Sequence, residues 1–440
     1  MTGNPTPALG FTPPSAPVEV AARATRFVLP NGLTLIVREN HANATIALQG
    51  AVKAGAIFDP PGKSGLAAFV AAMLDQGTRS ATAFEQASKV ESLGATLRFE
   101  GGLETVSVSG NMLSEDLDAI LAAMADALRN PIFPPDEIEK IRGELVTEVR
   151  IAENSTASVA SRRANELLYP EGHPYHFHPG GTEASLAAVT REDLAAFHAR
   201  HYGPGNLVLV LVGDLTPEQA SRSVTAALGE WAPLVSVPPF QVPPSPAPSS
   251  TRRVDVMKPG KSQADVVCAM PGVARTAADY DSAMMMNYVL GGGSLSSRLM
   301  DTLRDRQGLV YGVYSSLIGG IGAGPIQIRA GTNPKNAERA VNAILEQVTL
   351  LRDAGPTEEE MDAAKGFLTG VFPVRLETNT GVAHQLVSAE LYGLGLDYID
   401  RYLELIRAVT TENVTAAARR YLRPDTCVLV VAGDLTGSSS

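Results

Sequence analysis

The sequence lacks features that define several large classes of protein. The 440 residues carry a formal net charge of −11, so the chain lacks the basic face that nucleic-acid phosphates require. Only two cysteines are present, Cys268 and Cys427, and both lie in apolar, strand-like runs. We expect them to be buried free thiols and not a disulfide framework. No apolar run of about 18 residues occurs, so we expect no membrane-spanning helix.

The N-terminus also lacks the basic segment and apolar core of a signal peptide. Residues 1–24 are instead rich in proline and small residues, and we interpret them as a flexible N-terminal extension. We therefore expect a cytoplasmic protein that binds neither nucleic acid nor a membrane. Hydrophobic residues make up 45% of the chain, which is typical of globular proteins, and its length predicts two or more domains.

The chain contains an internal repeat. The segment YGPGNLVLVLVGDL at 202–215 resembles YLRPDTCVLVVAGDL at 421–435, and PPDEIEKIRGEL at 134–145 resembles PTEEEMDAAKGFL at 356–368. The offset of about 220 residues is too long for a solenoid unit and is typical of two homologous domains. Residues 233–250 hold seven prolines, which predicts an extended linker between them.

Each half of the repeat mixes strand and helix patterns. Alternating apolar residues predict strands at 34–39, 44–52 and 105–110, and longer amphipathic runs predict helices. We therefore predict an α+β fold in which each domain is an antiparallel sheet with helices packed on one face. The predicted N-terminal domain spans 25–232, and the C-terminal domain spans 251–436.

Several blocks of the sequence resemble one known family. They are FVLPNGLTLIVREN (27–40), GAIFDPPGKSGLAAFVAAMLDQGT (55–78), HPYHFHPGGT (173–182) and the 202–215 segment. In these blocks the chain is similar to the pitrilysin-like zinc metallopeptidases, which include insulinase and mitochondrial processing peptidase. The resemblance runs from about Arg26 to Leu435 and implies that family's two-domain, clamshell-forming fold.

The zinc motif of that family is missing. Family members carry His-x-x-Glu-His on a helix, and this chain has Ala68, Ala71 and Ala72 at the three functional positions. The resemblance places the third ligand at Glu148, and Ile141 replaces the acidic residue that usually precedes it by seven. A catalytic zinc needs three protein ligands, so a single carboxylate cannot hold it. We expect no metal or other cofactor in this chain, and we interpret Glu148 as an orphan ligand position.

The second half retains a different part of the family's active site. A helical face ends near Gly308, and LVYGVYSS at 309–316 alternates as a strand, so Arg304 lies in the last helical turn and Tyr311 on the strand. The resemblance implies that this pair donates hydrogen bonds to substrate and to the developing oxyanion. Without the resemblance, a helix-terminal arginine and ordinary packing of a strand tyrosine are the better explanation of the two residues. Arg306 is the rival arginine, and strand alternation places Tyr314 on the opposite face from Tyr311.

Two further segments are weaker candidates. In related processing peptidases a glycine-rich loop contacts substrate, and Gly291, Gly292 and Gly293 carry that resemblance here. A flexible connector explains these glycines equally well. The histidines of the 173–182 block, at 173, 176 and 178, have a spacing that could bind a transition metal, although the family turn at this place is structural.

The sequence thus predicts the non-catalytic subunit of a heterodimeric zinc peptidase. A homologous partner subunit would hold the zinc and the peptide substrate, and this chain would supply Arg304 and Tyr311 in trans. Two alternatives remain open. One is a purely structural or scaffolding subunit, and the other is a stand-alone hydrolase with an unorthodox metal site at the histidine-rich loop.

Overall fold

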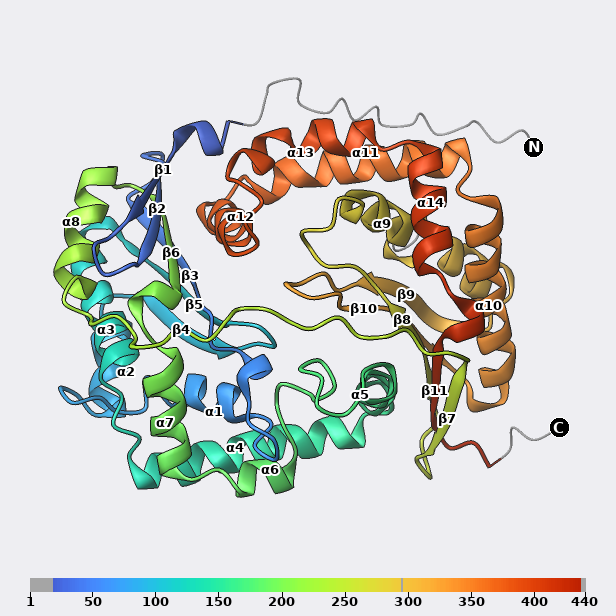
Figure 1. The fold of residues 1–440 in the computed structure, drawn as a ribbon, viewed down its shortest axis with the longest axis horizontal. Coiled ribbons are helices and arrows are strands. Elements are labelled where there is room, and N and C mark those ends of the chain that lie inside the picture. The colour runs from blue at the N-terminus through green and yellow to red at the C-terminus, as the bar shows by residue number, and fades with distance from the viewer. Residues whose placement is uncertain (1–18, 294–295, 437–440) are drawn as a thin grey trace, which may run out of the picture.

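The protein is built from two halves, each organised around one sheet (Figure 1). The computed structural model describes residues 19–293 and 296–436. The first sheet has six strands in the order β1-β2-β6-β3-β5-β4, and the second has five in the order β7-β11-β8-β10-β9. The first-sheet strands are β1 (Ala24–Val28), β2 (Thr34–Glu39), β3 (Thr45–Val52), β4 (Thr96–Gly101), β5 (Val106–Leu113) and β6 (Leu207–Gly213). The second-sheet strands are β7 (Arg252–Met257), β8 (Ala264–Pro271), β9 (Val310–Leu317), β10 (Pro325–Thr332) and β11 (Val428–Gly433).

Helices flank both sheets. Those of the first half are α1 (Leu66–Met73), α2 (Ala83–Glu91), α3 (Leu117–Arg129), α4 (Pro135–Asn154), α5 (Thr156–Leu168), α6 (Glu183–Ala187), α7 (Arg191–His201) and α8 (Pro217–Leu228). Those of the second half are α9 (Tyr280–Asn287), α10 (Ala337–Ala354), α11 (Glu358–Arg375), α12 (Asn379–Leu391), α13 (Asp397–Ala408) and α14 (Thr411–Tyr421). Among the described residues, no helix combines the length and apolar character needed to cross a membrane.

The two halves share one topology, as the internal repeat predicts. The order β7-β11-β8-β10-β9 repeats the order β2-β6-β3-β5-β4, with β1 added at the edge of the first sheet. Most neighbours are antiparallel, but β2 with β6 and β7 with β11 are parallel, so each sheet is mixed and not purely antiparallel. The repeat-related helices α7 and α14 also begin alike, because a capping box opens each of them, at Thr190 and at Thr410.

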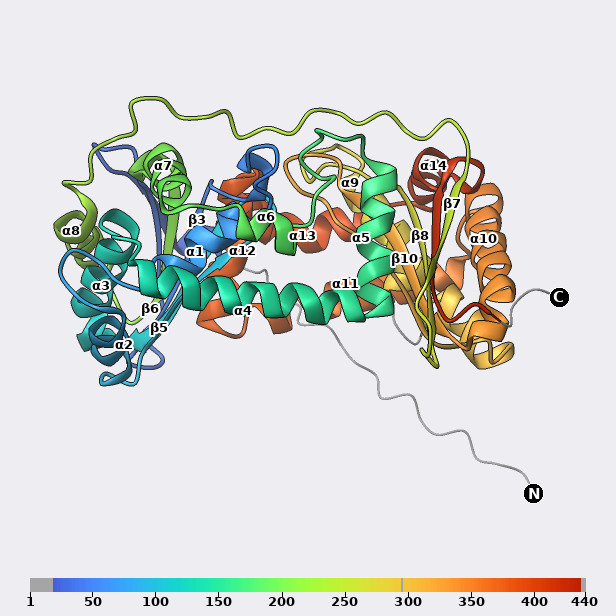
Figure 2. The same ribbon diagram turned by 90° about the horizontal axis from the view of Figure 1, so that it is seen from below.

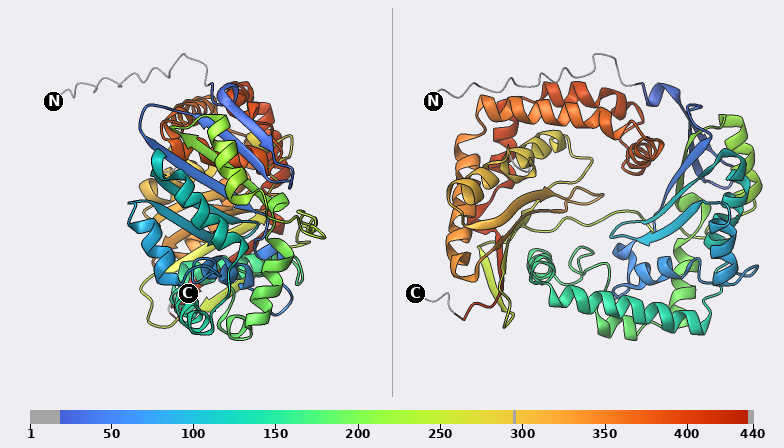
Figure 3. Two further views of the ribbon diagram at one scale, coloured as in Figure 1. Left: turned by 90° about the vertical axis from the view of Figure 1, so that its left-hand side faces the viewer. Right: turned by 180° about the vertical axis from the view of Figure 1, so that it is seen from behind.

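The helices cover both faces of each sheet, and this differs from the predicted single covered face. α12 of the second half packs on β3 and β6, and α5 of the first half packs on β8 and β11. In Figure 1, α4 and α5 reach from the first half to the second along one side of the molecule, and α11, α12 and α13 reach from the second half to the first along the other side. The view from behind in Figure 3 shows the same two bridges. Because β6 and β11 are covered on both faces, all of their residues are buried.

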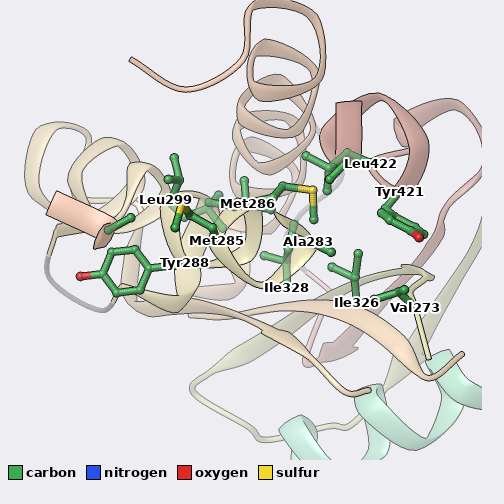
Figure 4. Packing of buried hydrophobic residues seen from close by; sticks show 14 of the residues in the cluster. Val273, Ala283, Met285, Met286, Tyr288, Leu299, Ile326, Ile328, Tyr421 and Leu422 are labelled. Carbon is green, nitrogen blue, oxygen red and sulfur yellow. The ribbon is translucent and has the colours of Figure 1, made fainter. Parts of the chain in front are cut away.

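Apolar residues of the two halves share parts of the core, because Ile36 and Val210 of the first sheet belong to the cluster built mainly from second-half residues. In the second half, the outer face of the sheet packs under α9, α10 and α14, and Ile326 and Ile328 of β10 lie beneath Met285, Met286 and Leu299 (Figure 4). Both cysteines belong to this core as free, buried thiols, as predicted.

One buried carboxylate joins the tips of hairpins from both halves. Glu104, in the β4–β5 turn, is 9% exposed. Its carboxylate accepts a hydrogen bond from the Tyr175 hydroxyl, one from the Tyr392 hydroxyl (3.2 Å) and one from the backbone N–H of Ile321 (2.9 Å). Ile321 belongs to the β9–β10 turn, where the N–H of Gly322 also donates to the Tyr175 hydroxyl (3.0 Å). We call these residues the Glu104 junction.

The proline-rich segment passes over this junction. Residues 233–250 form no helix or strand and run along one side of the molecule between α8 and β7 (Figure 2). The segment is nevertheless anchored, because the Pro243 carbonyl lies 3.0 Å from Nε2 of His173, and a Cβ on Gly322 would lie 2.7 Å from Val242.

The last part of the predicted N-terminal extension is held against the second half. Residues 1–18 lie outside the described residues. Val20 is buried in the core of the second half, and its N–H donates to Asp400 of α13 (2.7 Å). Residues 21–23 form a 3₁₀ turn that leads into β1, so residues 19–24 are anchored and not a free tail.

The Glu104 junction predicts a measurable stability effect. Replacing Glu104 with Gln keeps the side-chain shape, but it removes the charge and points an amide N–H toward hydrogen-bond donors. We expect Glu104→Gln to lower the free energy of unfolding by about 1–3 kcal/mol, measured by urea denaturation. Glu100→Gln is the matched control, because Glu100 is exposed on β4 of the same hairpin, and it should stay within about 0.5 kcal/mol of wild type. Equal stability of both variants and wild type would show that the junction does not hold the halves together.

Candidate functional site

The helix at the lost zinc position is α1. It begins after Gly65, whose φ of +91° is left-handed, and Asp59 accepts hydrogen bonds from the N–H groups of Gly65 (2.7 Å) and Ala67 (2.8 Å). Burial raises the pKa of Asp59 to about 7, against the opposing effect of these backbone donors. Asp59 therefore supplies the N-terminal cap of α1, which positions the motif face.

The motif face of α1 carries alanine only. Ala68 and Ala72 are half-buried on one side of the helix, as their spacing predicts, and Ala71 is fully buried. Strand β4 lies directly against this face, because a Cβ on Gly101 would stand 2.5 Å from Cα of Ala68. Ala71 therefore packs in the core and Ala72 packs against it, and none of the three side chains can ligate a metal or move a proton.

Glu148 lies on the exposed side of α4, at a hollow of about 200 Å³. The hollow is lined by α4, by Ser158 and Arg162 of α5, and by the loop at 178–181, but by none of the three alanines. No ion pair to Glu148 is present within the described residues. The loop reaches the start of α1, since a Cβ on Gly65 would lie 3.1 Å from Gly180. Ile141, seven residues earlier, is 6% exposed and packs in the core of the first half.

The histidine-rich loop uses its rings in backbone contacts. Nδ1 of His173 accepts from the N–H of Tyr175, Nδ1 of His176 lies 2.9 Å from the Tyr169 carbonyl, and Nδ1 of His178 accepts from the N–H of Gly180. Burial and the nearby Arg162 charge lower the pKa of His178. In the part of the chain that the structure describes, no three His, Cys, Asp or Glu side chains are grouped as metal ligands. The loop therefore has a structural role around the Glu104 junction.

Arg304 lies on a π-helical segment, Met300–Arg306, that ends at Gly308 with a φ of +59°. Its side chain is exposed and contacts only Sδ of Met300 (3.9 Å), and no carboxylate pairs with it among the described residues. The rival arginine differs, because Arg306 forms an ion pair with Asp301 (2.7 Å). Of the two arginines, Arg304 is thus the one whose guanidinium is free to bind a ligand.

Tyr311 and Tyr314 lie on the same face of the sheet, and the prediction that they face opposite ways is wrong. Gly331 pairs with Gly312 but Thr332 pairs with Val310, so Tyr311 is an extra residue in a β-bulge. The bulge resets the alternation, and the exposed fractions of Tyr311 and Tyr314 are 60% and 50%. Gly312 inside the strand pattern was the sequence signal for this bulge.

The three candidate glycines pack close to their neighbours. A Cβ on Gly291 would lie 2.6 Å from the backbone nitrogen of Ser315 on β9, and one on Gly293 would lie 3.0 Å from the Tyr288 ring. A Cβ on Gly292 would lie 2.7 Å from the Asn287 amide. Glycine is therefore needed here for close packing, whether or not the segment also contacts substrate.

One hollow lies between two of the candidate glycines and strand β9. It has a volume of about 370 Å³ and is lined by Gly291, Gly292, Met300, Gly312, Val313, Tyr314 and Ser315. Met300 is the residue that Arg304 contacts, and Gly312 directly follows Tyr311. Two of the candidate glycines therefore line a hollow at the edge strand β9, and Arg304 and Tyr311 are not among its lining residues.

Comparisons with known proteins agree with this architecture. Residues 34–171 match the family model described as Insulinase (Peptidase family M16), and residues 188–368 match the model described as Peptidase M16 inactive domain. An uncharacterized zinc protease of Streptomyces coelicolor is 25% identical over 414 residues, covering 92% of this chain and 89% of that protein. A Helicobacter pylori protein named as a non-peptidase homolog is 24% identical over 387 residues, covering 86% of this chain and 87% of its own.

Solved structures share the fold over nearly the whole chain. A peptidase M16 inactive domain from Pseudomonas fluorescens superposes with a TM-score of 0.88 at 27% identity, covering 95% of this chain and 100% of that one. A protease from Helicobacter pylori gives a TM-score of 0.87 at 21% identity, covering 93% and 99%. The predicted fold class and the family resemblance are both confirmed.

The alanine face of α1 predicts a result for metal content. We expect the isolated protein to contain no stoichiometric zinc and to hydrolyse no peptide, because Ala68, Ala71 and Ala72 supply neither ligand nor base. Elemental analysis and a peptide-cleavage assay measure this. Stoichiometric zinc accompanied by chelator-sensitive cleavage would contradict the prediction.

Restoring the motif predicts a gain of metal binding. The variant Ala68→His, Ala71→Glu, Ala72→His recreates the family's ligand set together with Glu148, so it should bind zinc in an equilibrium titration. Ile141 leaves that set without its usual acidic neighbour, so we expect an affinity about 10–100-fold below that of an intact site. The same triple variant carrying Glu148→Gln is the control and should lose the gained affinity. Equal zinc binding with and without Glu148 would show that Glu148 is not the matching position.

Proposed function

Because the chain belongs to the insulinase (M16) family of peptidases and lacks the family's zinc motif, we propose that it is the non-catalytic subunit of a heterodimeric zinc peptidase. A homologous partner subunit holds the zinc and its general base and binds the peptide along an edge strand. This chain completes the chamber and presents Arg304 and Tyr311 in trans. The pair binds the peptide and donates hydrogen bonds to the oxyanion that forms during cleavage.

The observation that carries this proposal is the exposure of both side chains at one sheet edge. Large aromatic side chains are usually buried, but the bulge turns the Tyr311 ring out of the sheet, where it is 60% exposed. Bulges of this kind re-aim a side chain next to active sites. Arg304, also exposed, has no carboxylate partner among the described residues. A hydroxyl and a guanidinium held in this way are suitable donors for developing negative charge.

The scaffolding alternative has a structural basis of its own. The Glu104 junction, and the packing of α5 and α12 each on the sheet of the other half, join the two halves as an architectural subunit would require. That role does not require an unpaired arginine or an exposed tyrosine, so the trans-acting role explains more of the structure. The stand-alone hydrolase has less support, because the histidine rings of its proposed loop are already engaged by backbone groups.

The trans role predicts activity losses in a reconstituted heterodimer. Tyr311→Phe removes one hydroxyl donor, and Arg304→Ala removes one charged donor. We expect kcat/KM for peptide cleavage to fall by roughly 10²-fold or more for each variant, because the lost hydrogen bonds act on the transition state. The affinity between the subunits, measured by titration, should stay unchanged.

The controls follow from the contacts described above. Arg306→Ala removes an arginine that is ion-paired to Asp301, and Tyr421→Phe removes a hydroxyl that bonds to Asp279 on the outer side of the second half. Both variants should retain nearly full activity. If Tyr311→Phe and Arg304→Ala are as active as these controls, the subunit contributes architecture alone.

A further inference from the structure

A second hollow opens on the inner face of the second sheet, next to the Arg/Tyr pair. α5 covers the inner faces of β8 and β11, and the inner faces of β10 and β9 extend beyond it. The hollow has a volume of about 360 Å³ and is lined by Ala157, Gln263, Asp265, Val266, Val267, Tyr311, Gly312, Tyr314, Arg329, Ala330 and Gly331. The hollow therefore lies between the first turn of α5 and the strands β8, β9 and β10.

Glycines form the floor of this hollow, and larger side chains stand around it. Gly312 of β9 pairs directly with Gly331 of β10, so no side chain rises from either residue at that point of the sheet. Arg329 pairs directly with Tyr314, and the bulge adds Tyr311 on the same side. Cross-strand partners lie within about 5.5 Å at Cβ, so the guanidinium and the phenol rings border one space.

Arg329 is held in place by a buried amide. Its Nε and Nη2 donate to Oε1 of Gln327, at 3.1 and 2.6 Å. Gln327 is 1% exposed, and its own Nε2 donates to Oδ1 of Asn165 on α5 (2.7 Å). This chain of hydrogen bonds fixes one edge of the guanidinium. Within the described residues no carboxylate forms an ion pair with Arg329, so its other N–H groups remain available to a ligand.

The one acid that lines the hollow is already engaged. Asp265 is 7% exposed, accepts a hydrogen bond from the Thr156 hydroxyl (2.5 Å), and accepts a second from the Gln263 amide (3.1 Å). It lies opposite Gly331 and forms no ion pair with Arg329. A partly buried arginine without an acid partner is uncommon, because removal from water disfavours its charge unless an anion compensates.

We propose that this hollow binds a carboxylate of the peptide substrate, with Arg329 as the anchor and Tyr311 and Tyr314 in contact with the adjoining residue. The planar guanidinium matches a carboxylate in two parallel hydrogen bonds, and the phenol rings offer apolar faces and hydroxyl donors. The carboxylate belongs either to an acidic side chain or to the C-terminus of the peptide. The inference rests on the proposed peptide-binding role, and it adds a preference for a negatively charged group at one position.

The test uses binding to the full-length chain alone, so it needs neither the partner subunit nor zinc. A short peptide with one internal glutamate and a free C-terminus is titrated into the wild type by calorimetry. Two derivatives, one with glutamine in place of the glutamate and one with a C-terminal amide, identify which carboxylate is recognised. We expect one of the two derivatives to bind at least about 10-fold more weakly than the parent peptide.

The variants test whether Arg329 is responsible. Arg329→Gln should weaken the parent peptide by at least about 10-fold and abolish the difference between the peptides. Arg329→Lys keeps the charge but not the planar guanidinium, so it should give an intermediate loss of peptide affinity. This variant also tests the inference if Arg329→Gln fails to fold. Arg407→Gln, at an exposed arginine on α13, is the matched control and should bind like wild type.

Several outcomes would overturn the inference. They are equal binding of all three peptides by the wild type, unchanged binding by Arg329→Gln, and displacement by inorganic phosphate at the peptide's own concentration, which would indicate a general anion site. Each of these results leaves the effect of Arg304 and Tyr311 on cleavage in the heterodimer unaffected. Conversely, a heterodimer insensitive to those two residues would not alter the binding results at Arg329.

Discussion

One buried carboxylate bridges the two halves, which also pack together through α5 and α12. A charged group removed from water is costly unless it is well hydrogen-bonded, and Glu104 meets this condition with two tyrosine hydroxyls and a backbone N–H. These donors come from the histidine-rich loop, the end of α12 and the β9–β10 turn. Glu104 has all of these donors only when the β4–β5 turn of the first half lies against the β9–β10 turn of the second. Its hydrogen bonds therefore favour the observed position of one half relative to the other.

The two halves carry one topology but have kept different chemistry. In the first half the metal-binding face of α1 has become alanine packed against β4, and Ile141 has joined the core. Both changes suit burial, because apolar side chains need no partner there. In the second half, Tyr311 and Tyr314 of the edge strand β9 are exposed, and so is Arg304 on the helical segment that precedes it. A fold built from a repeat can thus carry an apolar helix face in one half and exposed polar groups in the other.

The bulge in β9 shows how one backbone irregularity shapes a surface. Regular alternation would turn Tyr311 and Tyr314 to opposite faces, as the sequence pattern predicts. One extra residue opposite Gly331 and Thr332 brings both rings to the inner face, beside Arg329. A Cβ on Gly312 would meet nothing within 4 Å, whereas one on Gly331 would lie 2.8 Å from the Gln263 amide. Tyr314 therefore borders two hollows, one toward the glycine segment and one toward α5, and Tyr311 borders the second of them.

The sequence by itself determined the features that depend on residues near one another in the chain. These include the repeat, the strand at 34–39, the left-handed stop at Gly308 and the loss of ligands at 68–72. Only the tertiary structure decided that α5 and α12 each pack on the sheet of the other half, and that Tyr314 lies on the same sheet face as Tyr311. It also decided the Glu104 junction and the contact between Gln327 and Arg329. The physical reason is that each of these depends on strand register or on contacts between residues distant in sequence, and local periodicity carries no information about either.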